Sequence, residues 1–247
     1  MYARPQPSPV PEPRHRRRPV VTAIGVVGEL VLTAGVLVLL YVAYVLWGTG
    51  IHADMAQNDL REQTLEAWRN QDSSAPPDDG APVEDAESPD EEAASVADQI
   101  DIGDGYAFLR IPRFGANWEW VVVEGTNLSD LARGPGHYSD SADPGQLGNL
   151  AIAGHRSGYG APFADMDKLE SGDTIEIETA DGTWVYTIDQ SPVVIAPTDT
   201  WVVDPVPGAA AGTEPGERRL TLTTCHPRYG SSERMYVSAV LTSGPGM

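Results

Sequence analysis

Residues 20–47 form an apolar run whose only charge is Glu29, and no charged residue occurs between positions 30 and 47. As a helix rising about 1.5 Å per residue, this run would exceed the roughly 30 Å hydrocarbon core of a bilayer. We therefore predict a transmembrane helix over residues 20–47. Glu29 lies near its first third, where we expect the carboxylate to extend towards the nearer interface; protonation or contact with a partner helix are alternatives.

The residues flanking this run predict its orientation. Residues 1–19 are rich in proline and arginine, with a basic cluster at 14–18, and such clusters stay on the cytoplasmic side. Tyr41, Tyr44 and Trp47 resemble an interfacial aromatic belt at the other end. A cleaved signal peptide is the alternative, but the run is longer than a signal-peptide core. We predict a single-pass protein of the cell membrane with a cytoplasmic N-terminus and an extracellular remainder.

A juxtamembrane segment, residues 48–104, changes composition midway. Residues 51–69 contain no Gly or Pro and predict a helix, whereas residues 70–105 are acidic and contain no Lys or Arg. Such a stretch predicts a disordered linker, and it shows no regular spacing of calcium ligands. The formal net charge of −20 also argues against nucleic-acid binding.

The remaining residues, 105–247, predict an all-β domain. Short apolar segments alternate with Gly and Pro, and the Asp181-Gly182 pair predicts a hairpin turn. Two short helical segments are expected at 127–133 and 162–169. Regular short strands favour a sandwich or a barrel; they are expected at 107–111, 118–123, 150–155, 174–178, 183–189, 193–195, 219–224 and 235–241.

Cys225, the only cysteine of the chain, ends the predicted strand 219–224. A single cysteine can form no disulfide within the chain and cannot supply a paired-cysteine zinc site. Arg234 directly precedes the next predicted strand, 235–241, which would place its guanidinium beside the thiol. His155 follows the apolar run 149–154. Each residue also has a simpler interpretation. Cys225 could be a buried thiol, His155 a polar residue at a strand end, and Arg234 a solvated charge at a strand edge.

Three motifs resemble those of the sortases, the membrane-anchored cysteine transpeptidases of Gram-positive bacteria. They are GPGHY (134–138), GNLAIAGHR (148–156) and TLTTC (221–225) with Arg234. The resemblance covers residues 105–241 and is greatest to class E, the actinobacterial housekeeping type. It implies a closed eight-stranded β-barrel with short helices, and no metal or cofactor.

The resemblance also implies roles for single residues. The nucleophile would be Cys225, the histidine of the site His155 and its arginine Arg234, while Tyr138 would help to read the sorting signal. The substrate would be a C-terminal LAxTG-like signal cleaved between Thr and Gly. The acceptor would be an amine of a cell-wall precursor, lipid II, reached through a thioester on Cys225.

The chemistry suits these residue types. A thiolate is the nucleophile of cysteine enzymes, and a neighbouring imidazole can exchange a proton with it and then with the leaving amine. A guanidinium is always protonated and can stabilise an oxyanion. The resemblance implies that a small thiolate–imidazolium fraction reacts, while most molecules keep both groups neutral.

Alternatives exist for both residues and function. His137 could replace His155, but it follows Pro135-Gly136 in a loop and does not match the motif of the family's catalytic histidine. Arg228 could replace Arg234, but it lies in the middle of a loop, whereas the family's arginine begins the last strand. His226 follows Cys225 directly, and successive side chains of an extended chain point apart.

A peptidoglycan L,D-transpeptidase would need a Ser-His-Gly-Cys context, which the chain lacks around Cys225. A non-catalytic anchored β-barrel binding protein is the third possibility.

Overall fold

A computed structural model describes residues 19–44, 48–74 and 100–246 of the 247-residue chain. The chain divides into two compact units, residues 1–44 and 45–247. Nearly all of the predicted basic tail and most of the predicted acidic linker lie outside the described residues. Both predictions therefore stay predictions.

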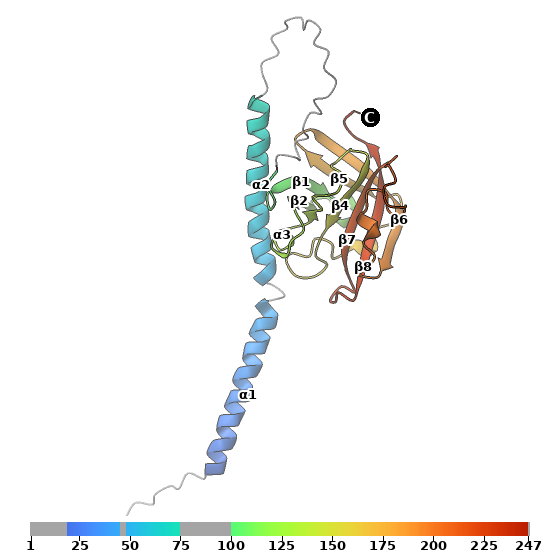
Figure 1. Cartoon of the computed structure of the whole chain (residues 1–247). Helices are drawn as coiled ribbons and strands as arrows, with labels where there is room; N and C mark the ends of the chain where they lie inside the picture. The colour runs from blue at the N-terminus through green and yellow to red at the C-terminus, as the bar shows by residue number, and fades with distance from the viewer. Residues whose placement is uncertain (1–18, 45–47, 75–99, 247) are drawn as a thin grey trace, which may run out of the picture. The chain divides into compact units, whose positions relative to one another are not determined.

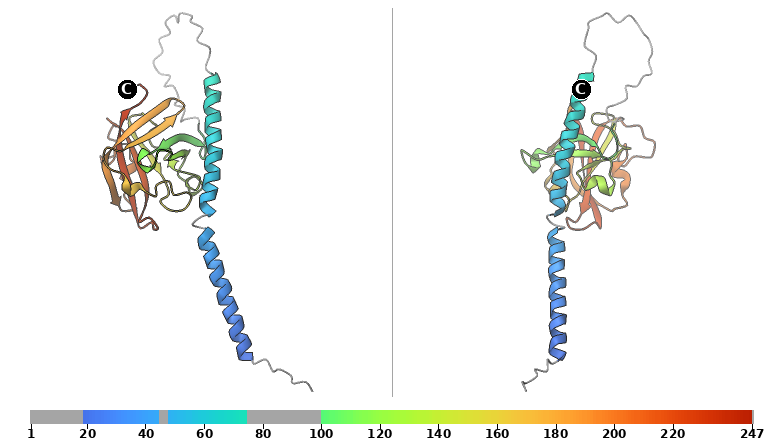
Figure 2. Two further views of the ribbon diagram at one scale, coloured as in Figure 1. Left: turned by 180° about the vertical axis from the view of Figure 1, so that it is seen from behind. Right: turned by 90° about the vertical axis from the view of Figure 1, so that its left-hand side faces the viewer.

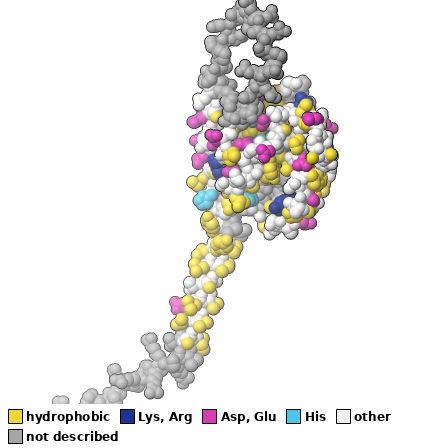
Figure 3. Space-filling model, viewed as in Figure 1, with side chains coloured by type: hydrophobic (Ala, Val, Ile, Leu, Met, Phe, Trp, Pro, Cys, Tyr) yellow, Lys and Arg dark blue, Asp and Glu magenta, His cyan; other side chains and the backbone are white. Residues whose placement is uncertain are grey.

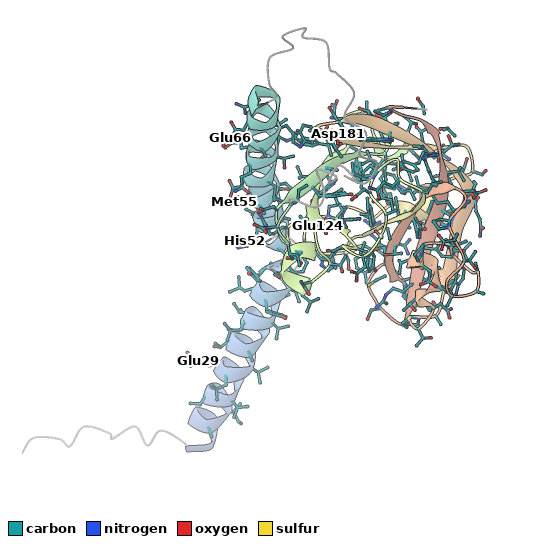
Figure 4. All side chains as sticks on the ribbon, turned by 45° about the horizontal axis from the view of Figure 1, so that its top comes forward. Glu29, His52, Met55, Glu66, Glu124 and Asp181 are labelled. Atoms are coloured by element: carbon teal, nitrogen blue, oxygen red, sulfur yellow. The ribbon has the colours of Figure 1, made fainter. Side chains whose placement is uncertain are left out.

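The first unit contains one described helix, α1 (Pro19–Ala43). Residues Ala23–Ala43 have a mean hydropathy of 2.4 and are long and apolar enough to cross a membrane. Apolar side chains cover the described surface of the helix (Figure 3). Glu29, labelled in Figure 4, is the one charged side chain within residues 23–43. This composition agrees with a membrane anchor, and the orientation stays a prediction.

Eight strands of the second unit close into a barrel in the order β1-β2-β3-β4-β7-β8-β6-β5, which confirms the predicted fold (Figure 1). The β2–β3 and β4–β7 pairs are parallel, and the other pairs are antiparallel. The strands are β1 (Gly105–Arg110), β2 (Glu119–Glu124), β3 (Gly136–His137), β4 (Gly148–Ala153), β5 (Thr174–Thr179), β6 (Gly182–Ile195), β7 (Arg218–His226) and β8 (Glu233–Ser243).

Alternation along β7 divides its side chains between the inside and the outside of the barrel. Leu220 and Leu222 are fully buried in the main core. Because successive side chains of a strand point to opposite faces, Thr221, Thr223 and Cys225 belong to the outer face.

Two strand predictions were wrong. The segments expected at 183–189 and 193–195 form one strand, β6, with register shifts on either side of Gln190. Pro192 lies in this irregular stretch, where its missing N–H removes no regular ladder bond. The two-residue strand β3 was missed, because so short a strand has no periodicity to detect.

The two predicted short helical segments are shorter in the structure than expected. The helix α3 (Leu128–Leu131) lies within the expected segment 127–133, and Asn127 and Asp130 form a capping box at its start. Of the expected helix 162–169, only the 3₁₀ turn η4 (Met166–Lys168) forms. Two further 3₁₀ turns occur, η3 (Pro112–Phe114) and η5 (Thr200–Val203).

The helix α2 (Thr49–Ser74) packs against the outer face of β1 and β2 (Figure 2). Its buried face recurs at helical spacing, with Ala53 and Leu60 at 0% and Thr64 at 2% exposure. Figure 4 labels His52, Met55 and Glu66 on the side facing away from the barrel. The barrel side of this contact consists of Phe108, Val121 and Val123.

Gln57 joins α2 to the barrel by polar contacts. Its Oε1 accepts a hydrogen bond from the Val121 N–H at 2.7 Å, and its Nε2 donates to the carbonyls of Val121 and Arg133 at 3.0 and 2.9 Å. The amide thereby satisfies backbone groups that an apolar side chain would leave without partners. The domain boundary at Gly105 stays a prediction.

Candidate active site

Cys225 and Arg234 are direct partners in the antiparallel β7–β8 ladder. Side chains opposite each other in such a pair lie on the same face, with Cβ atoms about 5 Å apart. Both residues are partly exposed on the outer face of the barrel. The sequence-based expectation that the guanidinium lies beside the thiol therefore agrees with the strand register.

One nitrogen of Arg234 holds the turn between β7 and β8. Nη1 donates to the carbonyls of Ser231 and Glu233, each at 3.0 Å. Within the described residues, both of these bonds use Nη1 and leave Nε and Nη2 of Arg234 unbonded to the turn. Those two nitrogens can therefore donate to a ligand on the outer face.

The segment before His155 is fixed to the end of β7. The Gly154 N–H donates to the Thr223 carbonyl at 3.0 Å, and the Thr224 hydroxyl donates to the Gly154 carbonyl at 2.7 Å. Gly154 also lies so close to the Phe163 ring that a Cβ there would come within 2.6 Å of it. His155 therefore emerges beside the strand end that carries Cys225.

Burial lowers the pKa of the His155 imidazole, because the charged form loses solvation. Tyr159 contributes to this environment: its ring stacks on the imidazole with centroids 4.9 Å apart and planes 24° apart. At neutral pH the imidazole is accordingly mostly neutral. Sequence reasoning missed Tyr159, because no periodic pattern covers the loop in which it lies.

Arg156 is a second residue that sequence reasoning did not single out. Its side chain is 5% exposed and lies between two partners. Nη2 pairs with Asp167 at 2.8 Å, and Nη1 donates to His226 Nδ1 at 2.7 Å. Arg156 thus links the end of β4 to the residue after Cys225, and a donor to Nδ1 requires an unprotonated nitrogen there.

Tyr138 lies beside β4, further along the barrel from the end that carries Cys225 and His155. Its N–H donates to the Ala151 carbonyl, which is two residues before Ala153, the partner of Thr223. The residue lines a cavity of about 390 Å³, which Val203, Asp204 and Pro205 of the β6–β7 connection also line. Cys225 is not among the lining residues of this cavity, and the substrate-binding role of Tyr138 stays a prediction.

The alternative bases and cations have other partners. His137 is 2% exposed, with Nδ1 at 2.7 Å from Glu124 and Nε2 at 3.0 Å from Ser141. Arg228 lies in the β7–β8 turn, where its Nη1 is 3.7 Å from Asp165 Oδ1. It is not paired with Cys225 in the strand ladder. These contacts favour His155 and Arg234 for the site.

No group of three or more His, Cys, Asp or Glu side chains in the described part of the chain is arranged to hold a metal ion.

Comparison with known protein sequences shows similarity to sortases. The family model of the sortase domain matches residues 109–242. Sortase SrtE2 of Streptomyces coelicolor is 32% identical over 235 residues, which cover 91% of this chain and 85% of SrtE2. Sortase SrtE1 of the same organism is 35% identical over 224 residues, or 88% of this chain. The chain spans 56% of the length of SrtE1.

Solved structures show the same similarity. Sortase E from Streptomyces avermitilis is 44% identical with a TM-score of 0.52, covering 58% of this chain and 91% of that one. Sortase E1 from Streptomyces coelicolor, solved with a tripeptide in the active site, is 38% identical with a TM-score of 0.51. That match covers 57% of this chain and 90% of the other.

Proposed function

The chain belongs to the sortase family, and we propose that it is a membrane-anchored cysteine transpeptidase with Cys225 as its nucleophile. The observation that carries the proposal is the pairing of Cys225 with Arg234 in the β7–β8 register, beside the strand end that leads to His155. These three residue types provide the nucleophile, the cation and the proton carrier that acyl transfer through a thioester requires.

In the first half-reaction, the Cys225 sulfur attacks the carbonyl carbon of the scissile peptide bond. The attack needs the thiolate, and an ordinary thiol with a pKa near 8.5 is mostly protonated at neutral pH. His155 takes the thiol proton and then gives it to the leaving amine, so the C–N bond breaks and a thioester remains. Because burial lowers the pKa of His155, only a small fraction carries the imidazolium at neutral pH.

Arg234 stabilises the oxyanion that forms when sulfur adds to the carbonyl. Its Nε and Nη2 can donate to that oxygen while Nη1 stays bonded to the β7–β8 turn. In the second half-reaction, an amine attacks the thioester, loses a proton to His155 and releases the Cys225 thiol. The acyl group then carries a new amide bond.

We infer that the substrate is a C-terminal LAxTG-like sorting signal cleaved between Thr and Gly, and that the acceptor is a lipid II amine. The similarity to sortase E proteins supports this class of signal. The tripeptide in the active site of the related sortase E1 supports a peptide ligand. Tyr138, at the cavity of the outer face, would contact the signal.

Incubation of the detergent-solubilised protein with LAxTG and LPxTG peptides and an amine tests this proposal. We expect faster cleavage of LAxTG, with the threonine joined to the added amine. If the protein is folded but cleaves neither peptide, the result would favour a non-catalytic anchored barrel.

Two arginine variants test the assignment of the cation. Removing one oxyanion donor slows comparable reactions by about 10²–10³-fold, and we expect such a loss in Arg234→Ala. A small alkylating reagent forms no oxyanion and should still modify Cys225 in that variant. Arg228→Ala is the matched control and should change cleavage little; the opposite pattern would move the role to Arg228.

A further inference from the structure

The loop after His155 contains four successive residues with positive φ. The angles are 69° at Gly158, 48° at Tyr159, 72° at Gly160 and 47° at Ala161. Glycine adopts such angles readily, but tyrosine and alanine do so rarely and only where surrounding contacts impose them. The backbone around Tyr159 is therefore held in place by its environment.

Three contacts hold this loop. Gly160 lies against Trp120 so closely that a Cβ would come within 2.4 Å of the indole. The Ala161 N–H donates to the Gly158 carbonyl at 2.7 Å, and the Phe163 N–H donates to the His155 carbonyl at 3.0 Å. The loop thus closes on itself and on β2.

The remaining contact comes from the first residue of α2. The Tyr159 N–H donates to Thr49 Oγ1 at 3.2 Å, across 110 positions of the sequence. The rest of α2 is bound to β1 and β2 through its buried face and through Gln57. Thr49 therefore belongs to an element with a fixed position on the barrel.

The loop geometry decides where the Tyr159 ring lies. With the backbone held as described, the ring stacks over the imidazole of His155 and is itself 38% exposed. It thus covers one face of the imidazole and restricts rotation of the ring. Within the described residues, no carboxylate or cation is paired with that imidazole; the adjacent Arg156 is bonded to Asp167 and His226.

We propose that Tyr159 is a positioning residue for His155, and that α2 takes part in the active site by holding the Tyr159 backbone through Thr49. This inference rests on the proposed role of His155. The stacked ring keeps the imidazole plane in one orientation and keeps water from one of its faces. The juxtamembrane helix thereby acts as a support for the catalytic loop as well as a connection to the anchor.

The substitution Tyr159→Gly separates positioning from folding. Glycine suits the positive φ, so the melting temperature should stay unchanged or rise. Loss of the stacked ring should lower kcat about threefold to tenfold, the range expected for an aromatic contact. It should also raise the pKa of His155 in an imidazole NMR titration, because water reaches the uncovered face.

Two variants serve as controls for the ring. Tyr159→Phe keeps the stacked ring and should retain both kcat and the His155 titration. Ala161→Gly relieves the same backbone conformation while keeping the ring, and it should also behave like the wild type. Equal loss in Ala161→Gly and Tyr159→Gly would show that loop flexibility alone is responsible and would overturn the proposal.

The contribution of α2 is tested by Thr49→Val in the full chain. The valine keeps the branched shape but removes the acceptor, and loss of one such hydrogen bond should lower kcat about fivefold. Thr49→Ser keeps the acceptor and should restore the rate. Equal rates in Thr49→Val and Thr49→Ser would remove α2 from the mechanism.

A His155→Ala variant distinguishes failure of this inference from failure of the proposed function. An active His155→Ala protein would overturn the proposed function itself. An inactive His155→Ala protein together with a fully active Tyr159→Gly protein, whose His155 titration is unchanged, would overturn only the positioning role.

Discussion

Replacing Leu60 by alanine measures how strongly α2 is attached to the barrel. Leu60 is fully buried and packs with Phe108, Val121 and Val123, while Trp68 lies at the edge of this cluster. Leu-to-Ala changes in cores lower the free energy of unfolding by about 2–5 kcal/mol. Because this cluster is small and near the surface, we expect about 2–3 kcal/mol.

For a domain of this size, 1 kcal/mol corresponds to about 2–4 °C in melting temperature. Leu60→Ala should therefore melt about 4–12 °C below the wild type when unfolding of the full chain in detergent is followed by near-UV circular dichroism. Leu65→Ala on the same helix is the matched control. Leu65 is 38% exposed, so its change should stay within about 0.5 kcal/mol.

The comparison of the two leucine variants shows whether the buried face of α2 stabilises the barrel. If Leu60→Ala and Leu65→Ala melt at the same temperature, α2 does not stabilise the barrel in the manner described. A fragment starting at Gly105 extends the test: we expect it to stay folded and soluble, as the predicted boundary implies, and to keep activity at about the reduced rate of Thr49→Val, because it lacks Thr49. Its unfolding temperature should nevertheless be lower, because Phe108, Val121 and Val123 lose their cover.

Three further predictions concern topology, packing and pH. A reporter fused after Met247 should lie outside the cell, and its recovery only in the cytoplasm would reverse the orientation. Gly154→Ala should lower both the melting temperature and peptide cleavage, because its Cβ would meet the buried Phe163 ring; wild-type values for both would contradict the close contact. Because burial lowers the His155 pKa, the unfolded state takes up this proton first as pH falls. Wild-type stability should thus fall more than that of His155→Gln as pH drops from about 6.5 towards the folded pKa, and equal losses by calorimetry would contradict that burial.

Much of the barrel was predictable because its strands follow simple alternation. In β7, Leu220 and Leu222 point inwards and the intervening threonines point outwards, so the sequence itself displays the strand period. The position of Arg234 beside Cys225 followed from the same reasoning, since a short turn joins the two strands. The strand β3 could not be found in this way, because two residues carry no period.

The role of α2 was not predictable from its apolar residues. Its buried face combines Ala53, Gln57 and Thr64 with Leu60, so no apolar stripe appears in the sequence. The stack of Tyr159 on His155 was missed for a related reason: it depends on a loop held by Thr49 from a distant part of the chain. Contacts of this kind depend on tertiary structure rather than on local pattern.

The most direct test of the central assignment is the mass of the protein after incubation with an LAxTG peptide and no added amine. We predict an adduct equal to the peptide segment up to threonine, located on Cys225 and released by hydroxylamine as expected for a thioester. Cys225→Ala should give no adduct, because it has no nucleophile. Peptide cleavage without any adduct on Cys225, or undiminished cleavage by Cys225→Ala, would contradict the proposed mechanism.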